Sequence, residues 1–228
     1  MKSISPTSLN IELRTIKAAL SMAVRWNYIF KNPFARLALV RVPETAPVYF
    51  AKNDLQALIR TVKESWLKEI IIFAAMTGMR RGEIVNLQWF NVDMERRTIR
   101  IESDATFKTK LGRSRTIAVN EAAWLVLKER KESAFQSDGL VFSYLGERIP
   151  ANWGTRLLKR YVRKLGYNEK LNFHSLRHTH CSWLVQAGVS LYEIQKLLGH
   201  SSITVTQIYA HLAPNELHKT VNRISLNL

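Results

Sequence analysis

Two short β-rich segments interrupt a chain whose apolar residues otherwise recur at helical spacing. They are residues 98–101 (TIRI) and 116–119 (TIAV), and the basic, glycine-containing stretch KTKLGRSR separates them. Runs of this kind joined across a turn favour an antiparallel hairpin. With a third strand at residues 140–142 (LVF), the sequence predicts an α+β fold that is predominantly α and contains a small three-stranded antiparallel β-sheet.

Helical periodicity flanks this sheet on both sides, because apolar residues recur there at steps of three and four. We expect helices over residues 8–32, 53–62, 66–77, 81–87, from 152 onward, 173–187 and 190–198, with further helical segments around Tyr209 and after Pro214. The residues suited to open a helix are Ser8, Asn53 and Ser190, and those suited to end one are Gly78, Gly188 and Gly199.

A linker divides the chain into two parts of unequal length. Residues 40–48 contain two prolines and no periodicity, which is typical of a connection between domains. We therefore assign residues 1–45 to a small helical region with its linker, and residues 46–228 to a larger domain that holds the remaining predicted elements.

The charge of the chain predicts a polyanionic partner. Its 34 Lys and Arg residues outnumber 18 Asp and Glu residues, so the formal net charge is +16. Chains this basic usually bind nucleic acid, because basic side chains release the counterions of phosphates. A charge that only keeps the protein in solution is the alternative. The densest basic run, residues 156–164, has five basic residues and no acid, so we expect it to face phosphates.

Several other classes of protein are not indicated. The single cysteine, Cys181, can form no internal disulfide and no cysteine-based metal cluster. His174 and His178 have the spacing of two zinc ligands on one helix face, but no third ligand follows nearby, so we expect no metal and no cofactor. No apolar stretch reaches the roughly 18 residues of a membrane span and the N-terminus lacks a signal-peptide core, so we expect a cytoplasmic, nucleoid-associated protein.

Four short clusters contain residue types that can act on a phosphodiester: residues 77–83 (TGMRRGE), 174–178 (HSLRH), 198–202 (LGHSS) and 206–211 (TQIYAH). Each alone has an ordinary role, as a helix cap, a core histidine or a packed tyrosine. Together and in this order they resemble the signature of the tyrosine recombinases of the phage-integrase type. That signature reads T-G-x-R-x-x-E, H-x-x-R, L-G-H-S and a terminal Tyr followed two residues later by His, and the resemblance covers about residues 50–228.

The resemblance implies a metal- and ATP-independent enzyme that cleaves and rejoins double-stranded DNA, most often for integration, excision or resolution of mobile DNA. Tyr209 would attack phosphorus and leave a 3′-phosphotyrosine with a released 5′-hydroxyl. By the same resemblance, the phosphate oxygens would be bound by Arg80, Arg177 and His200. The leaving 5′-oxygen would be protonated by Lys110, with Lys108 as a competing choice. His174 would assist as acid or base, and Glu83 would orient a catalytic His or Arg without touching DNA.

These residue types suit the reaction for physical reasons. A phosphodiester is anionic, so a protein that cleaves it without a metal must supply fixed positive donors to the transition state. The guanidinium of arginine can meet two phosphate oxygens and stays charged at any working pH. A phenol with a pKa near 10 is only about one part in a thousand ionised at pH 7, so its proton must leave during attack. The residues expected to contact DNA are Arg81, Lys108, Arg113, Arg115, Arg156, Lys159, Arg160 and Arg163.

The N-terminal part departs from the family pattern. Members usually carry a core-binding domain of about four helices that closes a clamp on DNA. The resemblance implies that residues 1–45 are a partial helical core-binding region and linker, similar to the second half of such a domain, either because the form is short or because other helices were left out. It also implies that residues 46–228 are the catalytic domain. The resemblance also implies self-assembly on DNA, from dimer to tetramer. Two alternatives are a type IB topoisomerase-like relaxing enzyme, which works as a monomer, and a DNA-binding module with impaired catalysis.

Overall fold

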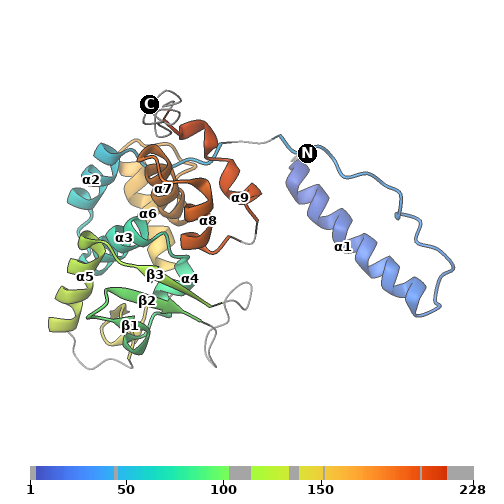
Figure 1. Cartoon of the computed structure of the whole chain (residues 1–228). Coiled ribbons are helices and arrows are strands. Elements are labelled where there is room, and N and C mark those ends of the chain that lie inside the picture. The colour runs from blue at the N-terminus through green and yellow to red at the C-terminus, as the bar shows by residue number, and fades with distance from the viewer. Residues whose placement is uncertain are drawn as a thin grey trace, which may run out of the picture. The chain divides into compact units, whose positions relative to one another are not determined.

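A computed structural model describes residues 4–43, 46–102, 114–133, 139–150, 152–200 and 202–214. The chain separates into two compact units, Met1–Thr45 and Ala46–Leu228, each of which is described by itself below (Figure 1). Within the described residues, no helix combines the length and the apolar character that crossing a bilayer requires.

The first unit consists of one long helix, α1 (Pro6–Arg25), and a return segment that follows it. The helix begins before the predicted Ser8, because Pro6 occupies the first turn and the side chain of Ser5 accepts a hydrogen bond from the Ser8 N–H. It also ends earlier than expected, because Asn27 adopts a left-handed φ of +63° that breaks the helical path.

Hydrogen bonds hold the return segment against α1. The Asn10 amide donates to the Val40 carbonyl oxygen at 2.7 Å and accepts from the Val40 N–H at 2.8 Å. The Lys17 ammonium donates to the carbonyl oxygens of Ala35 and Leu37. Residues 34–40 therefore run back along the helix in extended or turn conformation instead of prolonging it.

The second unit is built around one apolar helix, α3 (Ser65–Thr77), eight of whose residues are buried. It packs against α5 (Glu121–Glu132) and α7 (Phe173–Gln186), as Figure 1 shows. A helix that is apolar on most sides needs neighbours on most sides. The other helical elements of this unit are α2 (Lys52–Thr61), α4 (Arg81–Val85), η1 (Trp89–Asn91), α6 (Trp153–Lys164), α8 (Leu191–Leu198), α9 (Thr204–Gln207) and η2 (Ala210–Leu212).

A three-stranded antiparallel sheet lies beside these helices. Its strands are β1 (Val92–Asp93), β2 (Thr98–Ile101) and β3 (Arg115–Ala118), in the order β1-β2-β3. Ile99 pairs with Ile117 and both side chains are buried, so one face of the sheet joins the core. The predicted fold class, mainly α with a small three-stranded antiparallel sheet, is confirmed. A separate hairpin pairs β4 (Ser143–Tyr144) with β5 (Glu147–Arg148).

The third strand was predicted at the wrong place. Residues 140–142 form only an isolated bridge between Leu140 and Gln88, and the third strand is β1. The reason is that these three consecutive residues are all buried, with the Phe142 ring 4.9 Å from that of Phe73. A strand with one exposed face would alternate instead.

Most helix ends follow the predicted residues. Gly78 and Gly199 end α3 and α8 with a left-handed φ of +63°, and a capping box joins Ser190 to Glu193 at the start of α8. The prediction for Asn53 was wrong, because α2 begins at Lys52 without a side-chain cap. Contacts with α7 hold its start instead, since the Phe50 N–H donates to Thr179 Oγ1 and the Trp183 indole donates to the Phe50 carbonyl oxygen.

Candidate active site

Two arginines bind one carboxylate at the junction between α3 and α4. Gly78 turns the chain out of α3, and Arg80 then caps α4. The Glu83 carboxylate accepts from the Arg80 N–H at 2.8 Å and from Arg80 Nη1 at 3.0 Å. It also accepts from both terminal nitrogens of Arg115, on β3, at 2.9 and 2.6 Å. Burial raises the pKa of Glu83, but the hydrogen bonds and charges of Arg115 and Arg80 outweigh it, so the pKa falls below its usual value.

A third arginine joins α7 to the C-terminal ends of α3 and α8. Arg177 lies in the first half of α7 and is buried, and its guanidinium donates to the Gly78 carbonyl oxygen at 2.5 Å and to the Leu198 carbonyl oxygen at 2.8 Å. These carbonyls belong to helix C-termini, where a positive charge is favourable. Burial, followed by the charge of Arg80, lowers the pKa of Arg177 to about 10. The group therefore stays charged at neutral pH.

A neutral histidine follows the end of α8. His200 Nδ1 lies 2.9 Å from Thr206 Oγ1, and in the tautomer in which Nδ1 accepts from this hydroxyl, Nε2 carries the proton. Burial, followed by the charges of Arg177 and Arg80, lowers the pKa of His200 to about 4. At neutral pH, His200 is therefore an uncharged hydrogen-bond donor close to the arginine cluster.

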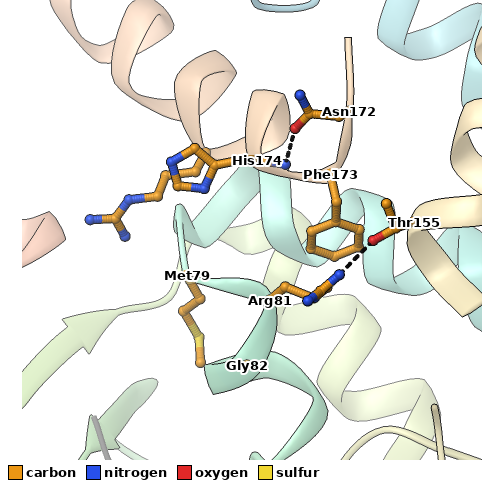
Figure 2. A pocket seen from close by; sticks show the side chains of 8 residues that line it. Met79, Arg81, Gly82, Thr155, Asn172, Phe173 and His174 are labelled. Atoms are coloured by element: carbon orange, nitrogen blue, oxygen red, sulfur yellow. Dashed lines mark hydrogen bonds between the residues drawn. The ribbon is translucent and has the colours of Figure 1, made fainter. Parts of the chain in front are cut away.

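A cavity of about 320 Å³ opens at the N-terminal end of α7 (Figure 2). Its lining includes His174 and Arg177 from the predicted catalytic set and Arg81 from the predicted DNA-contacting set. Arg81 Nη1 donates to Thr155 Oγ1 at 2.8 Å, so this wall joins α4 to α6. The other lining residues are Met79, Gly82, Asn172 and Phe173. Two arginines line the cavity, and its volume is large enough to admit a phosphate group.

The predicted nucleophile is not among the residues that line this cavity. Tyr209 lies between α9 and η2 with only 3% of its surface exposed, and its hydroxyl is hydrogen-bonded to His178 Nδ1. Its ring packs in a small apolar cluster with Cys181, Val185, Ile194 and Leu198. Burial, followed by the neighbouring Cys181, raises the pKa of the Tyr209 phenol. In this arrangement the hydroxyl is protonated and shielded.

The predicted DNA-contacting residues have mixed surroundings. Lys108 and Arg113 lie outside the described residues, and so does Lys110, the predicted general acid. On α6, the exposed residues are Arg156, Arg160 and Arg163, whereas Lys159 is half-buried and its ammonium donates to the Leu171 carbonyl oxygen. Glu64 lies 3.8 Å from Arg160 and Glu169 lies 3.3 Å from Arg163. The basic run therefore has acidic neighbours that come from other segments of the chain.

Two residues, His178 and Thr206, were not predicted from the sequence to contact the catalytic groups. His178 bonds the Tyr209 hydroxyl, and its ring packs edge-on to that of His174 at 4.8 Å. Thr206 holds His200. The four-residue spacing of His174 and His178 was the available signal, although that spacing also fits a pair of metal ligands. Within the described residues, no group of three His, Cys, Asp or Glu side chains could hold a metal ion.

The lowered pKa values of three histidines predict that the folded state loses stability in acid. Burial lowers the pKa of His178, His180 and His200 to about 4, from about 6.5 in an unfolded chain. Between these values the unfolded chain binds protons that the folded chain does not, so the free energy of unfolding falls as the pH falls from about 6.5 to 4. Each group contributes up to about 1.4 kcal/mol per pH unit.

Thermal unfolding between pH 7.5 and 4.5 measures this dependence. His180→Gln should flatten the profile, because one of the buried imidazoles is removed, whereas the exposed His211→Gln serves as a control that should leave it unchanged. Equal slopes for the parent chain and His180→Gln would contradict the assignment.

The chain resembles known proteins over most of its length. The model of the Phage integrase family matches residues 49–216. An integrase of Salmonella phage P22 is 33% identical over 228 residues, and the match covers 93% of this chain and 56% of that protein. The chain thus spans little more than half the length of this curated relative.

Solved structures share the fold. The Tn1549 transposon integrase in complex with a circular intermediate DNA has a TM-score of 0.80 and 21% identity, over 97% of this chain and 81% of that one. A lambda integrase tetramer bound to a Holliday junction has a TM-score of 0.70 and 19% identity, over 87% of this chain and 60% of that one. At sequence identities this low, the likeness shows a shared fold alone.

Proposed function

The chain belongs to the phage integrase family, and on that premise we propose that it is a site-specific recombinase that cleaves and rejoins DNA through a Tyr209 3′-phosphotyrosine. The observation that carries the proposal is the meeting of Arg80, Arg177 and His200, which come from three separate sequence clusters. The charges of both arginines act on the pKa of His200, so the three groups share one electrostatic environment. A cluster of fixed cations and a neutral donor is what an anionic, pentacoordinate phosphorus requires.

Each group has a distinct part in the proposed reaction. Arg80 and Arg177 bind the non-bridging oxygens of the scissile phosphate, and Nε2 of His200 donates a further hydrogen bond. Oxygen of Tyr209 attacks phosphorus while its proton passes to His174, and the bond to the 5′-oxygen breaks as Lys110 protonates that oxygen. A 5′-hydroxyl from another strand reverses these steps, because the phosphotyrosine conserves the energy of the phosphodiester. The proposed reaction consumes no ATP and needs no metal ion.

Tyr209 must move before it can attack. Its hydroxyl is bonded to His178 inside the small apolar cluster, whereas the arginines and His200 surround the ends of α3, α7 and α8. Leaving the cluster removes the burial that raises the phenol pKa, and arrival beside two arginines lowers the pKa further. We therefore propose that binding of DNA draws residues 202–213 out of the described arrangement.

Covalent capture tests the proposed function. The full chain is incubated in EDTA with a pool of nicked duplexes of randomised sequence, in which the cleaved fragment diffuses away and the adduct is trapped. We expect a protein–DNA adduct that survives denaturing electrophoresis, and sequencing of the trapped DNA identifies the preferred site. The absence of any adduct, or an adduct that forms only with Mg²⁺, would contradict the proposal.

Assembly on DNA belongs to the same proposal. The lambda integrase in the solved complex is a tetramer on a Holliday junction, and exchange of strands between two duplexes needs more than one nucleophile. We propose that this chain assembles on double-stranded DNA as a dimer to tetramer in the cytoplasm, associated with the nucleoid. In this proposal residues 1–45 form part of a clamp and residues 46–228 form the catalytic domain.

The general acid has a specific chemical test. Lys110→Ala should slow cleavage of ordinary DNA, because the 5′-oxygen then leaves without a proton. A substrate with 5′-sulfur at the scissile bond should restore the rate, since a thiolate needs no proton to leave. Single-turnover formation of the adduct measures both rates, and Arg80→Ala should show no such restoration. If Lys108→Ala is restored instead, Lys108 is the acid.

A further inference from the structure

Arg115 is positioned to act on the phosphate site without touching DNA. We infer that it is a positioning residue: it fixes the Glu83 carboxylate that holds Arg80, and it balances the charge of that carboxylate so that the charge of Arg80 stays available to a phosphate. The inference rests on the proposed function, because it assigns a role within the same reaction. Three observations support it, namely the hydrogen bonds of Glu83, the charges of the cluster and the position of Arg115 beside Gly199.

The hydrogen bonds of Glu83 are divided evenly between its two arginines. Its Oε1 accepts from Nη1 of Arg80 and from Nη1 of Arg115, and its Oε2 accepts from the N–H of Arg80 and from Nη2 of Arg115. Arg115 thus grips both oxygens in the bidentate manner that fixes a carboxylate most firmly. Without Arg115, each oxygen loses one of its two partners and the carboxylate can rotate away from Arg80.

The charges of the cluster give Arg115 a second effect. Two guanidinium groups share one carboxylate, so the cluster keeps a net positive charge, whereas Arg80 with Glu83 alone would form a neutral pair. The Arg115 side chain is 11% exposed and that of Arg80 is 26% exposed, so Arg80 is the more accessible of the two. The less exposed Arg115 therefore neutralises Glu83, and the charge of the more exposed Arg80 stays available to a phosphate.

Arg115 also lies directly against the segment that carries His200. A Cβ built on Gly199 would lie 2.7 Å from Arg115 Cδ, which is closer than a methyl group can approach. The φ of Gly199 is +63°, so the backbone favours glycine there, and a side chain at this position would displace Arg115. Strand β3 packs against α8, as Figure 1 shows. The Arg115 side chain thus contacts both the Glu83 carboxylate that holds Arg80 and Gly199, the residue next to His200.

These contacts change the interpretation that the sequence favoured for Arg115. It was predicted to contact DNA, yet both of its terminal nitrogens are bound to Glu83 and its side chain is mostly buried. A residue that contacts a phosphate contributes to affinity and to the salt dependence of binding. A positioning residue contributes to the rate of cleavage at saturating protein, and the two roles can be separated by experiment.

A double-mutant cycle tests the inference. Arg115→Gln, Glu83→Gln and the double variant are compared by the single-turnover rate of adduct formation at saturating protein, on the nicked duplex selected by covalent capture. Arg115→Gln should slow the reaction by on the order of tenfold to a hundredfold, as is typical for residues that orient a directly acting group. The double variant should be no slower than the slower single variant, because Arg115 acts through Glu83.

Two further measurements separate positioning from a phosphate contact and from a general loss of charge. The slope of DNA affinity against salt should not change in Arg115→Gln, whereas loss of a phosphate contact would lower it by about one. Arg115→Lys keeps the charge but cannot bridge both oxygens, so it should restore part of the rate. Arg97→Gln removes an exposed arginine from the turn between β1 and β2, where it pairs with Glu121 of α5, and this variant should cleave like the parent chain. Thermal melts identify any variant that fails to fold, and Arg115→Lys then carries the test.

Three results would overturn the inference: a parent rate in Arg115→Gln, effects of Arg115→Gln and Glu83→Gln that multiply in the double variant, or a reduced salt slope. Each of these results presupposes that the parent chain forms the adduct. If the parent chain forms none, it is the proposed function that has failed. The two failures are therefore distinguishable within one set of samples.

Discussion

Tyr209→Phe is expected to abolish the covalent adduct while leaving the dissociation constant for DNA unchanged. The substitution removes the one oxygen proposed to attack phosphorus, which is bonded to His178 on α7. The ring stays in its apolar cluster with Cys181 and Val185. The hydrogen bonds of its hydroxyl to His178 and to the Cys181 thiol are lost, so the free energy of unfolding should fall by about 1 kcal/mol.

Denaturing gels and binding titrations on the same nicked duplex measure the two effects separately. Tyr192→Phe is the matched control, because Tyr192 lies on α8 and is 61% exposed. It should form the adduct at the parent rate. An adduct that persists in Tyr209→Phe would show that a different residue is the nucleophile, whereas loss of DNA binding would show that the phenol has a structural role on the DNA-facing surface.

The parts of the site that could be predicted are those set by neighbours in sequence. The i to i+3 spacing of Arg80 and Glu83 places a carboxylate beside the arginine at the start of a helix, and the pair is formed in the structure. Gly78 and Gly199 were expected to end helices because glycine tolerates a left-handed φ, and both do so. These features depend on local backbone geometry, which a short stretch of sequence determines.

The parts that could not be predicted join residues distant in sequence. Arg115 pairs with Glu83 across 32 positions, and Tyr209 bonds His178 across 31 positions. Nothing local distinguishes Arg115 from the other basic residues of KTKLGRSR, so its inward direction follows only from the register of β3 and the depth of Glu83. The neutralising acids of the basic run on α6 were missed for the same reason, because they belong to other elements.

Arg80→Ala should slow adduct formation by on the order of a hundredfold to a thousandfold, equivalent to about 2.7 to 4 kcal/mol, as for removal of one preorganised donor to a developing oxyanion. It is a cleaner test than Arg177→Ala, which would also leave the Gly78 and Leu198 carbonyls without their buried donor and so weaken the fold.

The fold should tolerate Arg80→Ala, because Glu83 keeps both bonds from Arg115 and its charge stays balanced. The single-turnover rate at saturating protein gives the effect, and a thermal melt checks the fold. Arg96→Ala, at an 84% exposed side chain on the turn between β1 and β2, controls for the loss of one positive charge. A slowing of less than about tenfold would mean that Arg80 does not bind the phosphate in the transition state, since even a modest charged hydrogen bond contributes more than about 1.4 kcal/mol.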